Sequence, residues 1–457
     1  LTVMTFLGAG MLSGISAQVS PLQVDTLKET KIPDQWDLQS CIDYAKEQNI
    51  TIRKNRITAA STQIDVKTAK AAMFPSLSFS TGQQVVNRPY QETSSRVSGS
   101  EIISSNSKTS YNGNYGLNAS WTLYNGNKRL KTIQQEKLNN QMAELDVATS
   151  ENNIQESITQ VYIQILYAAE SVKVNENTLQ VSIAQRDRGQ ELLNAGSIAK
   201  SDLAQLEAQV STDRYQLVTA QATLEDYKLQ LKQLLELDGE NEMNIYLPAL
   251  SDENVLAPLP TKKDVYISAL SLRPEIEASK LNVEASELGI GIAKSSYLPT
   301  ISLSAGIGTN HTSGSDFTFG EQVKNGWNNS IGLSVSVPIF NNRQTKSAVQ
   351  KAKLQYETSM LSLLDEQKTL YKTIEGLWLD ANSAQQRYAA ANEKLKSTQI
   401  SYELISEQFN LGMKNTIELL TEKNNLLQAQ QEQLQAKYMA ILNTQLLKFY
   451  QGDQLAL

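Results

Sequence analysis

The sequence contains very few of the residues from which most active sites and metal sites are built. Its 457 residues include one cysteine, Cys41, and one histidine, His311. A single cysteine cannot form an intramolecular disulfide, and these two residues cannot supply a cysteine- or histidine-rich metal site. A serine–histidine catalytic machine would depend on that one imidazole. The composition therefore argues against an enzyme and predicts no cofactor and no bound metal.

Glycine, proline and excess positive charge are also scarce. The chain has 22 glycines and 10 prolines, about 7% of its residues, against roughly 12% in average proteins. So few helix breakers predict a mainly helical protein. The net charge of −7 argues against nucleic acid as a partner, because binding to phosphate needs basic patches.

The N-terminus has the pattern of an export signal. Residues 3–17, VMTFLGAGMLSGISA, are uncharged, small and apolar, as in the hydrophobic and cleavage regions of secretory signals. We expect residues 1–17 to form a signal peptide that ends at Ala17. The alternative is a disordered or buried apolar N-terminus. Beyond Ala17 no apolar run approaches the roughly 18–20 residues of a membrane-spanning helix.

The chain contains an internal two-fold repeat. Three segments recur in the same order, with offsets of 216 to 224 residues. The paired segments are 71–80 with 294–304, 117–126 with 333–342, and 192–203 with 408–419. We therefore expect a first repeat over 18–237, an irregular crossover over 238–261, and a second repeat over 262–457. Each repeat would run helix, strand, loop, strand, long helix, tight turn, long helix.

Proline placement predicts the long helices. No proline occurs between Pro89 and Pro248, or after Pro338. With apolar residues at helical spacing, this predicts helices over 127–194, 201–238, 343–411 and 415–451. The first and third would be about 100 Å long, so their moderately apolar stripes can be buried only along other helices. Shorter helices are expected over 38–72 and 262–297.

Four segments alternate apolar and small polar residues. We expect these strands at about 74–84, 114–124, 298–308 and 330–340, joined by polar loops over 84–113 and 309–329. Period-two alternation over about ten residues is typical of an outer-membrane β-barrel with a water-filled interior. The alternative is a soluble sandwich whose apolar face covers a protein core. The expected aromatic girdle consists of Trp121, Tyr124, Tyr297 and Phe340, with ordinary packing as the alternative for Trp121.

Four strands cannot close a barrel by themselves, because the smallest known barrels have about eight. An open sheet edge in lipid would leave backbone groups unpaired. A barrel would therefore be shared among chains. Two chains would give eight strands and three would give twelve, and only the larger barrel leaves a useful water-filled bore.

In the order and duplication of these segments the chain resembles the TolC family of outer-membrane efflux proteins. The resemblance runs from Trp36 to Gly452. It includes WDLQSCIDYAKEQNI, WTLYNGNKR, LRPEIEASKLNVEASELGIGIAKSSYLPTISLS and QFNLGMKNTIELL. It implies a homotrimer in the bacterial outer membrane, with a twelve-stranded transmembrane β-barrel and an α-helical barrel in the periplasm. It also implies an exit duct of a tripartite efflux or type I secretion system. The partners would be a periplasmic adaptor (membrane fusion) protein and an inner-membrane pump of the RND or ABC type.

The resemblance also implies functional positions at the helix tips. The turns that would contact the adaptor are Ala195-Gly196-Ser197 and Leu411-Gly412-Met413. The periplasmic aperture would use Lys414 and Glu418, and Thr421 stands where some family members have a second acid. Asp202 is the repeat counterpart of Glu418. The alternatives are ordinary turns and an ordinary solvated pair of charges four residues apart.

One other class of protein fits much of the sequence. A soluble periplasmic coiled-coil scaffold, or an adaptor-like protein, would also contain long helical hairpins. Adaptors, however, carry compact β-domains in place of paired amphipathic strands. His311, in an expected polar loop, is predicted to have no role, and Cys41 is predicted to be a small buried apolar residue.

Overall fold

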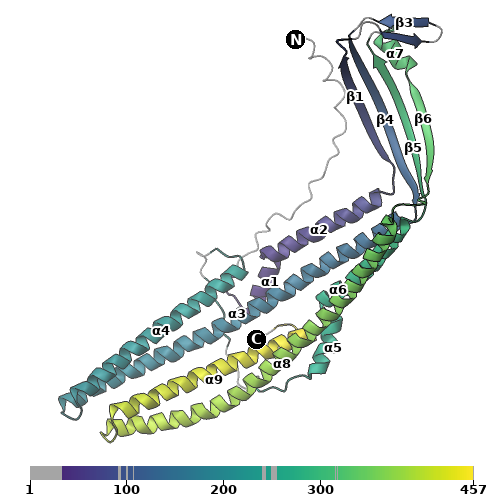
Figure 1. The fold of residues 1–457 in the computed structure, drawn as a ribbon. Coiled ribbons are helices and arrows are strands. Elements are labelled where there is room, and N and C mark those ends of the chain that lie inside the picture. Colours follow the sequence, from purple (N-terminus) through teal and green to yellow (C-terminus); the bar gives the residue numbers. More distant parts are fainter. Residues whose placement is uncertain are drawn as a thin grey trace.

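The computed structural model describes most of the chain after the predicted signal peptide, which lies outside the described residues. The described residues are 33–90, 94–98, 101–105, 108–238, 243–248, 255–313, 315 and 317–455, with the backbone alone at 94–98 and 101–105. The molecule is elongated, with long helices at one end and a curved sheet at the other (Figure 1).

Two long helical hairpins form the end of the molecule far from the sheet. The first pairs α3 (Lys128–Asn194) with α4 (Lys200–Leu234), and the second pairs α8 (Gln344–Asn410) with α9 (Thr416–Gln451). The hairpins lie side by side (Figure 1). Helices α3 and α8 have 67 residues each, so the internal repeat is visible in their equal lengths.

Helix α4 ends four residues before the predicted position 238. Leu235 is its C-cap, and Glu236 has a left-handed backbone with φ of +56°. That conformation cannot continue a right-handed helix.

The two shorter predicted helices, 38–72 and 262–297, are each broken into two. The first divides into α1 (Leu38–Gln48) and α2 (Ile50–Ala71) at Asn49, whose side chain accepts hydrogen bonds from the Thr51 and Ile52 amides at 2.9 and 3.4 Å. The second divides into α5 (Lys262–Leu272) and α6 (Pro274–Ser295). Proline disfavours the helical conformation of the residue before it, which is Arg273.

The four predicted strands form one antiparallel sheet in the order β1-β4-β5-β6. The strands are β1 (Ser76–Asn87), β4 (Thr109–Asn125), β5 (Thr300–Thr312) and β6 (Asn328–Ser336). Strands β4 and β5 extend beyond the predicted ends because polar residues such as Asn112 and Thr312 still pair. Strand β6 stops short of 340 before Pro338, which has no amide proton for a ladder.

The predicted loops contain short regular elements. Residues 84–113 include a hairpin of β2 (Ser94–Ser98) and β3 (Glu101–Ser105), and residues 309–329 include α7 (Phe319–Asn325). Helix α7 begins with a capping box between Thr318 and Glu321. The prediction of plain loops was wrong there.

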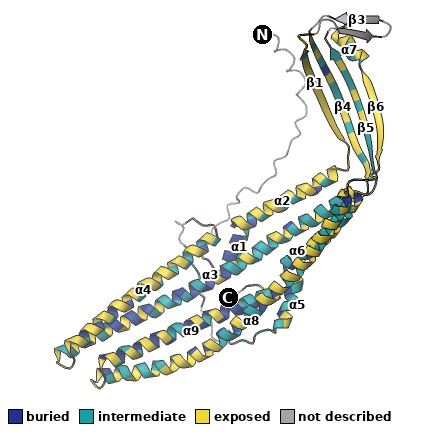
Figure 2. Cartoon of the chain, in the orientation of Figure 1, coloured by how far each residue is buried: buried dark blue, intermediate teal, exposed yellow. Residues whose placement is uncertain are grey.

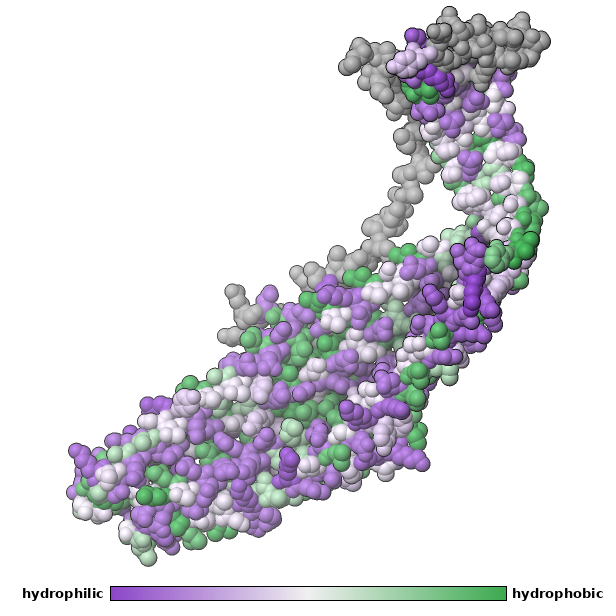
Figure 3. Space-filling model, viewed as in Figure 1, coloured by the Kyte–Doolittle hydropathy of each residue, from purple (hydrophilic) through white to green (hydrophobic). Residues whose placement is uncertain are grey.

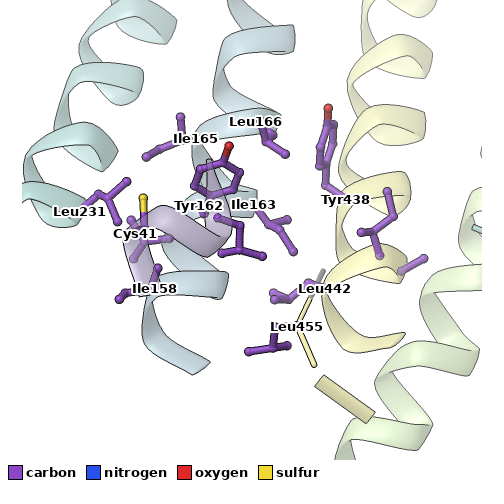
Figure 4. Packing of buried hydrophobic residues seen from close by; sticks show 14 of the residues in the cluster. Cys41, Ile158, Tyr162, Ile163, Ile165, Leu166, Leu231, Tyr438, Leu442 and Leu455 are labelled. Atoms are coloured by element: carbon purple, nitrogen blue, oxygen red, sulfur yellow. The ribbon is translucent and has the colours of Figure 1, made fainter. Parts of the chain in front are cut away.

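The main hydrophobic core lies at mid-length, where α1, α3, α4 and α9 meet (Figure 4). Its centre is Tyr162 of α3, which is 1% exposed and donates a hydrogen bond to the Tyr246 carbonyl at 2.5 Å. Cys41 is fully buried in this core, as predicted, and burial raises the pKa of its thiol to about 12. The core fixes the long helices relative to one another.

The helices in the described part of the chain lack the character of membrane spans. None of the helices in these ranges combines the length and the apolar character that a membrane span needs.

Candidate functional site

The two hairpin tips are glycine turns of the same geometry. Gly196 has φ of +76° and Gly412 has φ of +74°. The Gly196 amide donates to the Leu193 carbonyl at 2.9 Å, and the Gly412 amide donates to the Phe409 carbonyl at 2.9 Å. No atom lies within 4 Å of the position where a Cβ would stand at either glycine. Glycine is therefore required by the left-handed backbone and not by lack of space.

The residues around the two turns differ in character. Ala195 and Ser197 flank the first glycine. The second turn exposes larger apolar side chains, since Leu411 is 75% and Met413 is 70% exposed. In the next turn of helix Ile417 is 63% exposed. The tip of the second hairpin is thus an exposed apolar surface made by Leu411, Met413 and Ile417.

Lys414 and Glu418 contact one another at the start of α9. Lys414 Nζ lies 2.6 Å from Glu418 Oε1. Glu418 also closes a capping box, because its amide donates to Asn415 Oδ1 at 2.9 Å and its Oε2 accepts from the Asn415 amide at 3.3 Å. The hydrogen bond from Lys414, with that from the Asn415 amide, lowers the pKa of the Glu418 carboxyl. Both side chains are partly exposed.

The repeat counterpart of Glu418 shares one half of this geometry, the bond from the N-cap amide to the carboxylate. Asp202 stands at the third position of α4, and its Oδ2 accepts from the Ala199 amide at 3.0 Å. Thr421 is exposed, and its hydroxyl donates to the Ile417 carbonyl of its own helix at 2.8 Å. Each of these carboxylates, Glu418 and Asp202, accepts a hydrogen bond from the amide of the N-cap residue and so stabilises the first turn of its helix. This role was not predicted from the sequence.

The sheet exposes large apolar side chains. Leu77 and Phe79 of β1 are 69% and 66% exposed, and Ile331 and Leu333 of β6 are 83% and 65% exposed. Strands β1 and β6 are coloured mostly exposed in Figure 2. In the described part of the chain no helix packs over these side chains to form a core. A soluble sandwich would bury such a face, so this sheet has the surface of a lipid-facing wall.

The predicted aromatic girdle lies at the helix-proximal end of this sheet. Trp121 and Tyr124 are in the last part of β4, Tyr297 precedes β5, and Phe340 follows β6. Their exposed fractions are 39%, 37%, 51% and 85%. The Trp121 indole donates to the Met73 carbonyl at 2.7 Å, so its polar end is satisfied while the ring remains half exposed. Phe74 lies just before β1 and is 72% exposed, although it was not predicted to belong to the girdle.

Comparison with known proteins settles the family. The sequence model described as outer membrane efflux protein matches residues 41–236 and 265–452. The chain belongs to the outer membrane efflux protein family.

Curated members of the outer membrane efflux protein family are distant in sequence. The chain is 24% identical over 299 residues to outer membrane efflux protein BepC of Brucella suis, covering 65% of this chain and 62% of that protein. It is 24% identical over 291 residues to outer membrane protein TolC of Escherichia coli, covering 62% of this chain and 58% of that protein. The chain thus spans about three fifths of the length of these relatives.

Solved structures of membrane proteins share the fold over most of the chain. A CusC structure superposes with a TM-score of 0.77 at 18% identity, covering 91% of this chain and 92% of that chain. The outer membrane protein VceC of Vibrio cholerae gives a TM-score of 0.74 at 16% identity, covering 92% and 97%. The mainly helical fold with a barrel-forming sheet, predicted from the sequence, is confirmed.

The most deeply buried charged pair among the described residues was not predicted from the sequence. Lys423 of α9 and Asp213 of α4 form an ion pair whose side chains are 4% and 1% exposed. Lys423 and Ser182 of α3 also share a hydrogen bond, and Ser182 donates to Asp213. Burial lowers the pKa of Lys423, and the hydrogen bond to Asp213 opposes that shift.

This buried cluster connects the two hairpins. Ser182 and Asp213 belong to the first hairpin, and Lys423 belongs to the second. The Gln209 side chain supports the cluster by donating to Asp213 Oδ1 at 2.9 Å. The sequence did contain an indication of this buried pair. Lys423 lies on the same apolar stripe of α9 as the buried Leu419 and Leu426, and a lysine in that position is fully buried only when it is paired.

His311 was predicted to lie in a polar loop without a role, but it lies in a strand and packs against aromatic rings. It lies in β5, and its ring centroid is 5.2 Å from Tyr111, 5.9 Å from Tyr115 and 5.0 Å from Phe319. The contact with Phe319 joins α7 to the sheet. His311 thus helps to hold α7 on the end of the sheet far from the helices (Figure 1).

Proposed function

We propose that this chain is the outer-membrane exit duct of a tripartite efflux or type I secretion system. In this role it passively conducts substrates from an inner-membrane pump and a periplasmic adaptor to the outside. One observation carries the proposal. The sheet has an exposed apolar face, and the same chain continues from this sheet into helices about 100 Å long. Family membership supports the same role, and the proposal includes no catalytic step.

The duct is a homotrimer in this proposal. The strand order leaves β1 and β6 as free edges, and in lipid the backbone groups of both edges need partners. Three copies would pair each β6 with a neighbouring β1 and close a barrel of twelve strands. The helices of the three copies would continue the same wall into the periplasm. Localisation in the outer membrane, with the helices in the periplasm, follows from this arrangement.

The hairpin tips are the proposed contact with the adaptor. The exposed surface of Leu411, Met413 and Ile417 is of the kind that another protein covers, and the turn around Gly196 provides a second, more polar contact. The relatives include a protein named alkaline protease secretion protein AprF and one named probable efflux pump outer membrane protein TtgC. These names support a duct that serves a secretion or an efflux system, and an inner-membrane pump of the RND or ABC type is part of the proposal.

The proposed aperture consists of Lys414 and Glu418 from each copy. Three Glu418 carboxylates around a threefold axis would repel one another and attract cations. The bond from Lys414 would moderate that repulsion in the closed state. Thr421 adds no charge there, so the proposed acidic ring is single.

We also propose that the chain divides into the two repeats 18–237 and 262–457, joined by 238–261. The family match in two separate segments supports this division.

A pair of substitutions on adjacent residues of β6 tests the membrane role. Leu333→Arg places a charge on the apolar face, whereas Ser334→Arg places it on the small polar face. An arginine on the lipid side of a barrel costs about 2–4 kcal/mol near the membrane midplane. We expect Leu333→Arg to reduce the amount of heat-modifiable trimer extracted from outer membranes, while Ser334→Arg leaves it near the wild-type amount. Equal behaviour of the two variants, with protein recovered without detergent, would favour the soluble scaffold.

A further inference from the structure

Every junction between the sheet and the helices carries basic residues and no acidic residue. The junction segments are 66–80, 117–135, 288–305 and 331–356. Lysine or arginine occurs in each of them, and no aspartate or glutamate occurs in any, although the whole chain has 48 acidic and 41 basic residues. Two exposed lysines of these segments, Lys351 and Lys353, lie further along α8. We call the six exposed basic residues nearest in sequence to a strand the basic collar: Lys67, Lys70, Lys128, Lys294, Arg343 and Lys346.

The collar follows the aromatic girdle at a fixed short spacing. Counted from the sheet toward the helices, each junction has an exposed aromatic residue and then a basic residue three or four positions away. These pairs are Phe74 with Lys70, Tyr124 with Lys128, Tyr297 with Lys294, and Phe340 with Arg343. Figure 3 shows the same order, with a hydrophobic strand edge next to hydrophilic residues where the helices begin.

The collar charges have no acidic partner in the part of the chain that the structure describes. Among the described residues none of the six collar side chains forms an ion pair with an acidic side chain. The basic groups of Arg129 and Lys131, in the same region, are bonded to the carbonyls of Thr122 and Gly291. The six collar residues are therefore exposed on this chain without an acidic partner among the described residues.

Two helices that begin at the collar, α3 and α8, lack the features that normally stabilise a helix start, which are an N-cap side chain or an acid in the first turn. The N-cap residues of α3 and α8 form no side-chain cap, and neither helix has an acid in its first turn. In α3 the Asn125 side chain accepts a long hydrogen bond, 3.4 Å, from the Arg129 amide. Each other described helix has an N-cap side-chain bond or an acid in the first turn. Lys128 and Lys346 stand in those first turns, where positive charge is unfavourable beside the positive end of the helix dipole. A function that needs positive charge would account for the exception.

We infer that the basic collar binds anionic phospholipid headgroups of the periplasmic leaflet and so fixes the depth of the duct in the membrane. The inference rests on the proposed membrane role of the sheet. Aromatic side chains lie at the headgroup level of membrane proteins, and three or four further residues bring the collar to the phosphates. Basic residues near an anionic surface add binding energy one by one and are screened by salt.

The test compares two fourfold variants of the trimer purified in neutral detergent. The collar variant is Lys70→Gln, Lys128→Gln, Arg343→Gln and Lys346→Gln. The control variant removes the same charge from exposed positions on the long helices, with Lys173→Gln, Lys200→Gln, Arg214→Gln and Lys396→Gln. Thermal unfolding is measured while phosphatidylglycerol, phosphatidylcholine or inorganic phosphate is added, at low and high salt.

Phosphatidylglycerol should raise the melting temperature of the wild type and of the control variant, with the effect reduced by salt. The collar variant should need about tenfold more lipid for half of the shift. Phosphatidylcholine and inorganic phosphate should have little effect. An equal response of all three proteins, or an equal response of the wild type to both lipids, would overturn the inference. So would a shift that phosphate alone reproduces.

Conductance in bilayers separates this inference from the proposed function. Wild-type channels without a phosphatidylglycerol response would leave the duct in place and remove the lipid site. A collar variant with altered ion selectivity and an unchanged lipid response would place the charges in the water-filled bore, which also contradicts the inference. Absence of channels in every protein would overturn the duct itself.

Discussion

At the residue scale, the turns at Gly412 and Gly196 require glycine because of their left-handed backbone and not because space is short. Substitution Gly412→Ala meets no atom within 4 Å, so the expected cost of about 1–2 kcal/mol comes from the left-handed conformation. Hydrogen exchange should show faster opening of residues 408–416, and efflux by the assembled system should fall.

Gly376→Ala is the matched control for the tip glycine. Gly376 also has open space around its Cβ position, but it lies inside α8 with an ordinary helical backbone. Alanine there should be neutral or stabilise the helix by up to about 1 kcal/mol. Equal loosening of the two segments would contradict the assignment of the tip as a conformational glycine.

Glu418 makes the start of α9 sensitive to acid. Its pKa is lowered from 4.5, first by the Lys414 hydrogen bond, so the charged form is favoured in the folded protein. Stabilisation by this carboxylate is therefore complete above its unfolded pKa and is lost as the pH falls through the lower folded value. Hydrogen-exchange protection of residues 415–419 should be constant above pH 4.5 and decline below it.

Glu418→Gln removes the titrating group and provides the control for this acid sensitivity. The variant should show weaker protection at neutral pH and little change on acidification. A decline of the same size in the variant would assign the acid sensitivity to other groups.

The sequence predicted the tip residues well and their local roles incompletely. Gly196 and Gly412 were predictable because left-handed helix ends favour glycine. Asn415 and Glu418 form a capping box that the spacing N-x-x-E already indicates, although from the sequence Glu418 was interpreted only as an aperture acid or a solvated charge. Lys423 was missed because a charged residue is normally placed on the solvent side, and its partners lie more than 200 positions away.

At the element scale, the buried cluster of Ser182, Asp213 and Lys423 fastens one hairpin to the other. Lys423→Met should destabilise the trimer by about 3–5 kcal/mol per chain, because it leaves the buried Asp213 charge unpaired. The double substitution Lys423→Met with Asp213→Leu should recover most of that loss. Urea unfolding in detergent measures both.

Lys414→Met is the comparison for the buried pair. Its ion pair with Glu418 is partly exposed, so its removal should change the unfolding midpoint little. If Lys423→Met were equally mild, the cluster would contribute nothing to joining the hairpins.

The long elements were predictable because their signals are strong. The proline-free stretches and the period-two strands place the long helices and all four strands of the sheet. The breaks at Asn49 and Arg273 were missed, although Pro274 indicates the second. The hairpin of β2 and β3 and helix α7 were missed because short polar segments carry no hydrophobic period.

At the scale of the whole molecule, the sheet and the helices are two parts of one wall. The sheet exposes apolar side chains with no core to cover them, and the hairpins extend far from it with a core at mid-length (Figure 1). The repeat explains why two similar hairpins stand side by side. The need for more than one chain was predictable from the four strands, whereas the cluster that joins the hairpins depends on the tertiary arrangement alone.

The most direct test of the proposed duct is single-channel conductance of the detergent-purified protein in planar bilayers, comparing the wild type with Glu418→Ala. The proposal predicts a steady, cation-preferring conductance in the wild type, because three carboxylates would face the aperture, and a larger conductance in the variant. A conductance unchanged by the substitution would keep the duct and remove Glu418 from the aperture. No conductance, with protein that stays soluble without detergent, would contradict the duct.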